Sequence, residues 1–76
     1  MTNKYFVSML IDDCRAHLNQ TIEMGVQGSY VCGILTNVQE GVLTISDALV
    51  TTGEKTISRK SVTVDVFSVG WWCWYA

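Results

Sequence analysis

The chain of 76 residues has no proline, one histidine and only 16% charged residues, whereas about 25% is usual. It contains no repeat and no Gly/Ser-rich stretch that resembles a linker, so we expect one domain over residues 1–76. No apolar stretch approaches the roughly 20 residues that cross a membrane. The apolar run at 5–11 ends at two aspartates without a cleavage site, unlike a signal peptide. The sequence therefore predicts a cytoplasmic protein without a membrane partner.

Basic residues are also scarce. Five Lys and Arg against seven Asp and Glu give a net charge of -2 and a pI near 5.0. Because neutralising phosphates requires clustered cations, this composition excludes nucleic-acid binding by bulk electrostatics. Three of the five cations, Lys55, Arg59 and Lys60, nevertheless fall close together in the sequence. An assembly of identical subunits would repeat this cluster once per subunit and form a local positive rim on an acidic particle.

Residues that carry chemistry are few. Three cysteines at irregular spacing do not form a secreted disulfide framework, which favours reduced thiols. Cys14 and His17 would share a helix face, but a metal would need two further ligands and no CxxC or HxxxH spacing is present. No GxSxG, HExxH or glycine-rich phosphate motif occurs. We therefore predict no catalytic residue, metal, cofactor or small-molecule substrate; a thiol-dependent enzyme using Cys14 is the hypothesis to exclude.

Apolar residues, in contrast, are abundant. They make up 49% of the chain, and the mean hydropathy is +0.25. A domain this short buries only roughly 60–65% of the surface of its unfolded chain. Some apolar surface must therefore remain exposed on a single copy, and such patches mark interaction surfaces. The composition predicts a homo-oligomer.

The N-terminal segment is predicted to be a helix over residues 3–18, capped by Asn3. Apolar residues recur there at spacings of three and four and form one stripe. The members of the stripe are Phe6, Met9, Leu10, Cys14, His17 and Leu18. The alternative is a strand over residues 5–11 followed by a turn over 12–15, which the β propensity of the segment favours.

Five strands are predicted after the helix, over residues 21–27, 30–38, 42–49, 55–58 and 61–69. Glycines precede the second and third of them, as in hairpins. Gly33 lies inside the second strand, where a glycine permits a sharp bend or a close backbone approach. The five strands predict a small barrel over 21–69. Residues 70–76 form a separate tail that carries four large aromatic side chains, with Gly70 ending the strand before it.

The central strands resemble the first signature of the Sm and Sm-like family, which includes the bacterial Hfq type and short chains carried by bacteriophages. The matching residues are Gly28, Tyr30, Gly33, Leu35, Val38, Ile45, Asp47 and Ala48. The resemblance implies a mostly β fold in which an N-terminal helix precedes a small, strongly bent, five-stranded SH3-like barrel. It also implies a ring, of about five to seven subunits here, that binds single-stranded RNA.

The resemblance also suggests where RNA would bind. Gln39 stands where the family has an aspartate, and residues 57–60 stand where the family has its pore-side isoleucine-arginine-glycine signature. The candidate RNA-binding residues are Asn37, Gln39, Lys55, Arg59 and Lys60. Base edges would be read by the two amides, and phosphates would be held by the three cations.

Apolar side chains on the outward face of the last strand and in the tail are the candidates for the subunit interface. They are Phe67, Val69, Trp71, Trp72, Trp74 and Tyr75. A second role for the tail is a platform on which nucleobases stack. The predicted function is non-catalytic RNA binding or an RNA-chaperone-type role. The alternative is a structural or assembly module that binds only protein through the barrel and tail.

Overall fold

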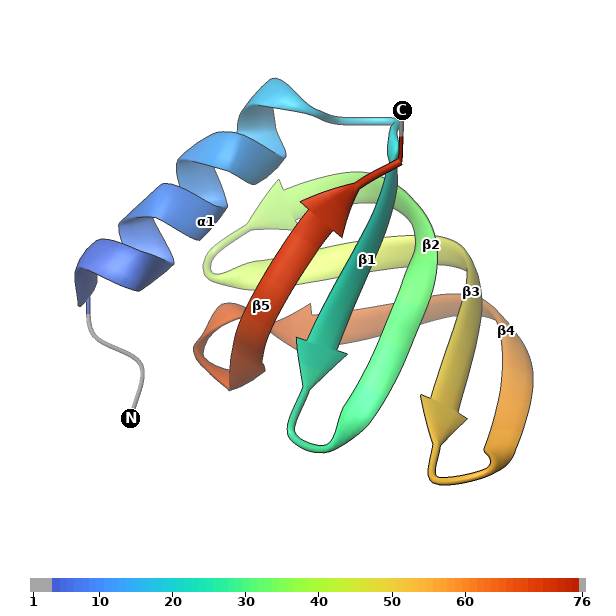
Figure 1. Cartoon of the computed structure of the whole chain (residues 1–76). Helices are drawn as coiled ribbons and strands as arrows, with labels where there is room; N and C mark the ends of the chain where they lie inside the picture. Colours follow the sequence, from blue (N-terminus) through green and yellow to red (C-terminus); the bar gives the residue numbers. More distant parts are fainter. Residues whose placement is uncertain (1–3, 76) are drawn as a thin grey trace.

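The computed structural model describes residues 4–75 and consists of one helix followed by five antiparallel strands (Figure 1). The elements are α1 (Lys4–Ala16), β1 (Thr21–Val26), β2 (Ser29–Gln39), β3 (Val42–Thr52), β4 (Lys55–Asp65), a 3-10 turn η1 (Val66–Ser68) and β5 (Val69–Trp74). The strands form one sheet in the order β4-β3-β2-β1-β5, so β4 and β5 are its edges. The fold class predicted from the sequence is confirmed.

Helix α1 buries Val7, Leu10 and Cys14 against the sheet, which settles the choice between helix and strand. The predicted stripe was wrong at Met9 and Leu18, which are 60% and 42% exposed, because the side of the helix that meets the sheet is centred on Val7, Leu10 and Cys14. It ends at Ala16, two residues earlier than predicted, because the chain reverses there through Asn19, whose φ is 69°. The backbone N–H of Asn19 donates to the carbonyl of Leu35 at 2.7 Å. The predicted cap Asn3 lies outside the described residues. No helix within 4–75 is long and apolar enough to cross a membrane.

Two tight hairpins set the register of the central strands. Gln27 and Gly28 have φ values of 46° and 83°, and Glu40 and Gly41 have values of 53° and 77°. Positive φ at both central residues is the type I′ geometry that matches the twist of the flanking strands. The glycine before each predicted strand therefore marks a turn, as the sequence indicated.

Gly33 produces the close backbone approach that the sequence predicted. A Cβ at this position would lie 2.6 Å from Ile45 Cγ2 and 2.8 Å from the carbonyl oxygen of Ser46. The pairing of β2 with β3 shifts register between Cys32 and Ile34, opposite Asp47, whose φ is 51°. This irregularity bends both strands and curls the sheet into an open barrel.

The core lies between the concave side of the curled sheet and α1. All of its members are apolar: Val7, Leu10, Cys14, Ile22, Met24, Val31, Leu35, Leu43, Ile45, Ala48, Val64, Val66 and Val69. The helix lies over one end of the barrel, as Figure 1 shows. Burial of this set stabilises the chain by roughly 25 cal/mol for each Å² of apolar surface removed from water.

The predicted division of the last third of the chain was wrong. Residues 55–58 and 61–69 were expected to be separate strands, but β4 runs unbroken from Lys55 to Asp65 because no turn residue interrupts it. The turn comes later, where the Asp65 carboxylate accepts a hydrogen bond from the backbone N–H of Phe67 at 2.9 Å. The fifth strand is β5, which begins at Val69 and takes up most of the expected tail 70–76. Gly70 does not end a strand; it is the extra residue of a bulge in β5, because Val69 and Trp71 pair with the consecutive residues Val26 and Gly25.

Candidate nucleic-acid interface

The aromatic residues of β5 divide between the two faces of the sheet. Trp72 lies opposite Met24 of the core, and its indole meets the ring of Phe6 edge to face at 5.2 Å. Trp74 stacks on His17 with 4.5 Å between ring centroids. Trp71 is half-exposed on the opposite face. Because side chains alternate along the strand, Trp72 and Trp74 lie on the face that packs against the helix, and Trp71 lies on the face exposed to solvent.

Asp13 ties α1 to β5. Its Oδ2 accepts hydrogen bonds from the indole Nε1 atoms of Trp72 and Trp74, each at 2.7 Å. The Trp72 bond is the main influence that lowers the pKa of Asp13 below its ordinary value; burial opposes it, while Trp74 and His17 add to it. A single carboxylate therefore joins the helix to one edge of the sheet.

We expect Asp13→Ala to lower the free energy of unfolding by about 1–3 kcal/mol, since two charge-assisted hydrogen bonds are lost from a partly exposed site. Because the pKa of Asp13 is lowered on folding, its contribution is fully present above the ordinary value of 3.8 and is lost as the pH falls through the folded value. Urea titrations at pH 7 and near pH 3 measure both effects. Equal sensitivity of Asp13→Asn and the wild type to acid would contradict the proposed contribution.

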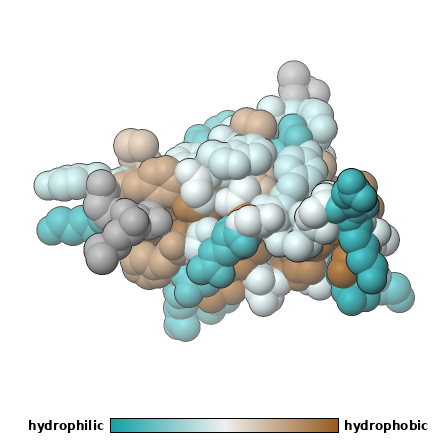
Figure 2. Space-filling view, turned by 60° about the horizontal axis from the view of Figure 1, so that its bottom comes forward, coloured by the Kyte–Doolittle hydropathy of each residue, from teal (hydrophilic) through white to brown (hydrophobic). Residues whose placement is uncertain are grey.

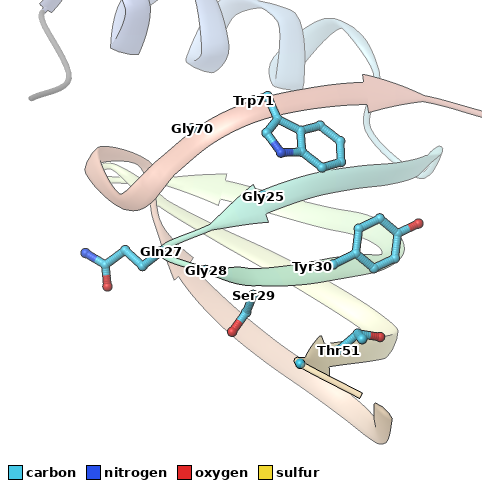
Figure 3. Close-up of a pocket in the computed structure, with 9 residues that line it drawn as sticks. Gly25, Gln27, Gly28, Ser29, Tyr30, Thr51, Gly70 and Trp71 are labelled. Carbon is cyan, nitrogen blue, oxygen red and sulfur yellow. The ribbon is translucent and has the colours of Figure 1, made fainter. Parts of the chain in front are cut away.

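Trp71 forms one wall of a hollow of about 440 Å³ at the end of the sheet where the β1–β2 and β3–β4 hairpins turn (Figure 3). The other lining residues are Gly25, Gln27, Gly28, Ser29, Tyr30, Thr51, Gly53 and Gly70. None of them is charged, and the polar ones offer hydroxyl, amide and backbone groups. We call this the Trp71 hollow. It combines an aromatic surface with uncharged hydrogen-bonding groups.

Two contacts fix the position of the indole. It lies over Gly25, where a Cβ would come within 2.1 Å of Trp71 Nε1. On its other side is Tyr30, with 6.2 Å between ring centroids (Figure 3). The Tyr30 hydroxyl donates a hydrogen bond to Glu23, which is the main reason that the pKa of Tyr30 is raised. The aromatic wall is therefore positioned before any ligand arrives.

The three clustered cations of β4 do not line one site. Lys55 and Arg59 line a second hollow of about 370 Å³ together with Val50, Thr52 and Ile57, which we call the β4 hollow. Thr56 points to the other face, and its hydroxyl lies 2.8 Å from that of Thr51, which lines the Trp71 hollow. Lys60 is exposed and lines neither hollow. It lies where the alternation of faces along β4 breaks, because Arg59 is opposite the buried Ala48 and Val62 is opposite the buried Ile45.

The candidate amides lie apart from the cations. Asn37 and Gln39 are exposed near the β2–β3 turn, at the other end of the sheet from Lys55. The β4–β5 junction that packs against this turn is η1, whose Val66 N–H donates to the Gly41 carbonyl at 3.0 Å. The match of 57–60 to the pore-side signature was therefore wrong, because these residues lie inside β4. The junction carries Asp65 and Phe67 rather than a cation.

The candidate interface residues differ in exposure. Val69 is only 1% exposed and belongs to the core of a single copy, which corrects its assignment to the surface. Trp72 and Trp74 are half-buried under α1, whereas Phe67 and Tyr75 are exposed. Hydrophobic surface also appears between hydrophilic side chains in Figure 2. Within residues 4–75, the large exposed apolar side chains are Tyr5, Met9, Leu18, Val42, Leu49, Ile57, Phe67, Trp71 and Tyr75.

The structure gives no support to chemistry at Cys14. The thiol is fully buried, and burial, with a smaller contribution from Asp13, raises its pKa to about 12. His17 contacts Asp13 and Trp74 instead. Within residues 4–75, no group of three or more His, Cys, Asp and Glu side chains is placed to hold a metal ion. A thiolate nucleophile requires a lowered pKa and access to solvent, and Cys14 has neither.

Sequence reasoning missed most of the Trp71 hollow. Local patterns mark Gly25 and Tyr30 only as strand positions and do not single out Gln27, Ser29 or Thr51. The available signal was Gly25, since a glycine inside an alternating strand often marks a close approach by another group. The large group that approaches is provided by a residue 46 positions later, which only the pairing of β1 with β5 reveals.

Comparison with solved structures identifies the fold. The chain is similar to a Pyrococcus abyssii Sm protein solved in complex with a uridine heptamer, with a TM-score of 0.73 and 12% identity over 86% of this chain and 96% of that one. A heptameric archaeal Sm protein gives 0.72 and 13% over 86% and 98%. The P. aerophilum SmAP1 heptamer gives 0.74 and 14% over 90% and 95%.

No protein-family model and no curated protein sequence matches the chain. The identities to the solved structures are low, so the likeness concerns the path of the backbone. The phage origin suggested by the resemblance stays a prediction. From helix to last strand, the chain has the Sm-like fold.

Proposed function

We propose that this protein is a ring-forming, non-catalytic RNA-binding protein that holds single-stranded RNA by stacking a nucleobase in the Trp71 hollow. The observation that carries the proposal is the hollow itself, an aromatic wall fixed beside uncharged hydrogen-bonding groups. Nucleobases are planar and heteroaromatic, and their edges carry both donors and acceptors. Stacking on an aromatic side chain is worth about 1–3 kcal/mol for each base.

The surroundings of the hollow suit a single strand rather than a duplex. Its bases must be unstacked to reach Trp71, which single strands permit. Lys60 is an exposed cation of β4 outside the hollow and would meet a phosphate of the bound strand. One cation in each copy gives only weak binding to RNA. A ring would repeat the site in every subunit, and several sites together would bind one strand more tightly. This arrangement agrees with an acidic protein that does not bind nucleic acid by charge alone.

Assembly follows from the two edges of the sheet. Among the described residues, no other strand covers the outer side of β4 or of β5. If β4 of one copy pairs with β5 of the next, the contact is head to tail, and such contacts form a ring when the rotation from copy to copy closes. We propose about five to seven copies. The relatives in two of the solved structures are heptamers, which supports a closed assembly.

The proposed RNA site differs from the one expected at the β2–β3 turn. That region presents Glu40 and Asp65 near Asn37 and Gln39, and carboxylates repel phosphates. The exposed Phe67 makes it better suited to contact protein. A module that binds only protein remains the competing function and is the outcome if no RNA binds.

We expect fluorescence anisotropy to show binding of labelled U-rich and A-rich RNA at micromolar protein, weakening with salt. Lys60→Ala should weaken it further and reduce the slope of log K against log [salt] by about 0.7 if one phosphate contact is lost. Lys4→Ala removes the same charge from α1 and is the matched control. A duplex that binds as well as the single strands would contradict base stacking. No binding by any RNA would leave the protein-binding module.

A further inference from the structure

The polar side chains that line the Trp71 hollow are mostly engaged with other strands or turned outward. The hydroxyls of Ser29 and Thr51 lie 2.7 and 2.8 Å from a threonine hydroxyl of the neighbouring strand. The amide of Gln27 points away from the two aromatic rings in Figure 3. A side chain beside the hollow is therefore the better candidate for distinguishing one nucleobase from another.

Glu23 lies directly beside the hollow, on the same face of the sheet. It is two residues from Gly25, which lies beneath the indole, and residues two apart in a strand share a face at a distance of about 7 Å. The rings of Trp71 and Tyr30 extend away from the β1–β2 hairpin, toward the part of β1 that holds Glu23 (Figure 3). A base stacked on Trp71 can therefore present its edge to the Glu23 carboxylate.

This carboxylate is held in place but keeps acceptor capacity. Its Oε1 accepts a hydrogen bond from the Tyr30 hydroxyl, which orients the side chain. Its Oε2 accepts from the Cys73 thiol, a weak donor, at 3.7 Å. Within residues 4–75, Glu23 forms no ion pair with a Lys or Arg. Because a carboxylate offers about four acceptor positions, Oε2 can accept a further hydrogen bond.

We propose that Glu23 selects nucleobases with an exocyclic amino group, cytosine and adenine before uracil, an inference that rests on the RNA site proposed above. The amino group donates a hydrogen bond to Oε2, as cytosine N4 does to other carboxylates. Uracil carries a carbonyl oxygen where cytosine carries its amino group, and that oxygen repels the carboxylate. The two pyrimidines have the same ring size and stack alike, so Glu23 is what distinguishes them.

Oligocytidine and oligouridine of equal length test the selection. With the full chain, we expect fluorescence anisotropy to give about ten-fold tighter binding of labelled oligocytidine, as for one hydrogen bond to a charged group. Glu23→Ala should abolish the preference by weakening the binding of oligocytidine. Glu23→Gln should abolish it by strengthening the binding of oligouridine, because the amide NH₂ donates to the uracil carbonyl. A merely disturbed aromatic wall would instead weaken both oligonucleotides by the same factor.

Glu40→Gln is the matched control. It makes the same change in the β2–β3 turn, at the other end of the sheet from the Trp71 hollow. The loss of one negative charge there should leave the ratio of the two affinities unchanged. Circular dichroism checks that each variant is folded.

The possible results separate the selection from the RNA site itself. A wild-type chain that binds both oligonucleotides equally, and more weakly after Trp71→Ala, would overturn the selection and leave the stacking site standing. A preference for oligocytidine that persists in Glu23→Ala would also overturn the role of Glu23. A chain that binds neither oligonucleotide would overturn the RNA site and the selection together. Loss of the preference in both Glu23 variants, and not in Glu40→Gln, supports the assignment.

Discussion

Replacing Trp71 by alanine is expected to weaken binding of single-stranded RNA by about 5- to 150-fold, the equivalent of one lost stacking contact of about 1–3 kcal/mol. The indole is held between Gly25 and Tyr30 and is 48% exposed, so its loss removes a positioned aromatic wall and little of the core. Anisotropy titrations with the same labelled RNA measure the change. The assembly mass should stay constant.

A second substitution, at Gly25, should disturb the same hollow by displacing the Trp71 indole. In Gly25→Ala the new Cβ would lie 2.1 Å from Trp71 Nε1, and the half-exposed indole is the group that can move. We expect a similar loss of affinity, with no further loss when both substitutions are combined. Tyr5→Ala is the matched control, because Tyr5 is a 74% exposed aromatic residue of α1 outside the hollow. Equal losses at Tyr5 and Trp71, or a lower assembly mass for Trp71→Ala, would contradict a base site here.

Gly33→Ala is expected to lower the free energy of unfolding by about 3 kcal/mol, toward the upper end of overpacking effects. Its Cβ would lie 2.8 Å from the carbonyl oxygen of Ser46 and 3.1 Å from the Cα of Ala48, and backbone atoms cannot rotate away. For a domain of this size each kcal/mol lowers the melting temperature by about 4–8 °C. Thermal and urea unfolding at a fixed protomer concentration measure the effect.

Gly70→Ala is the control for the loss at Gly33. It makes the same change in a strand, but the nearest atom would be 3.8 Å away, an ordinary contact. We expect a change within about 0.5 kcal/mol, as for most surface substitutions. Two variants of equal stability would show that the bend does not depend on the missing side chain at Gly33.

Local patterns predicted the elements whose cause is local. The apolar spacing in α1, the alternation in β1 and the Gln27-Gly28 and Glu40-Gly41 turns all act within a few residues. The Sm-like fold therefore follows from the order and spacing of residues along the chain. Gly33 was recognised as well, because only a glycine tolerates such a close approach inside an apolar strand.

Local patterns failed in the last third of the chain, where they misplaced the end of β4 and missed the strand β5. The resemblance to the family divides the run 55–69 at Arg59 and Lys60, but β4 stays paired with β3 on both sides of Lys60, at Arg59 and at Ser61. The aromatic segment was expected to be a tail because Gly70 suggested an end to the strand. Pairing with β1 absorbs that glycine in a bulge and turns the segment into an edge strand.

The amino-acid sequence by itself determined that this chain is small, acidic and rich in apolar residues, and it predicted an N-terminal helix and a bent sheet. These properties depend on composition and on spacings of a few residues. Only the tertiary structure decided which side of the sheet each functional group faces. Strand pairing placed Trp71 over Gly25, kept Arg59 out of the Trp71 hollow and brought two indoles to Asp13. Contacts between residues so far apart depend on register, which no local pattern contains.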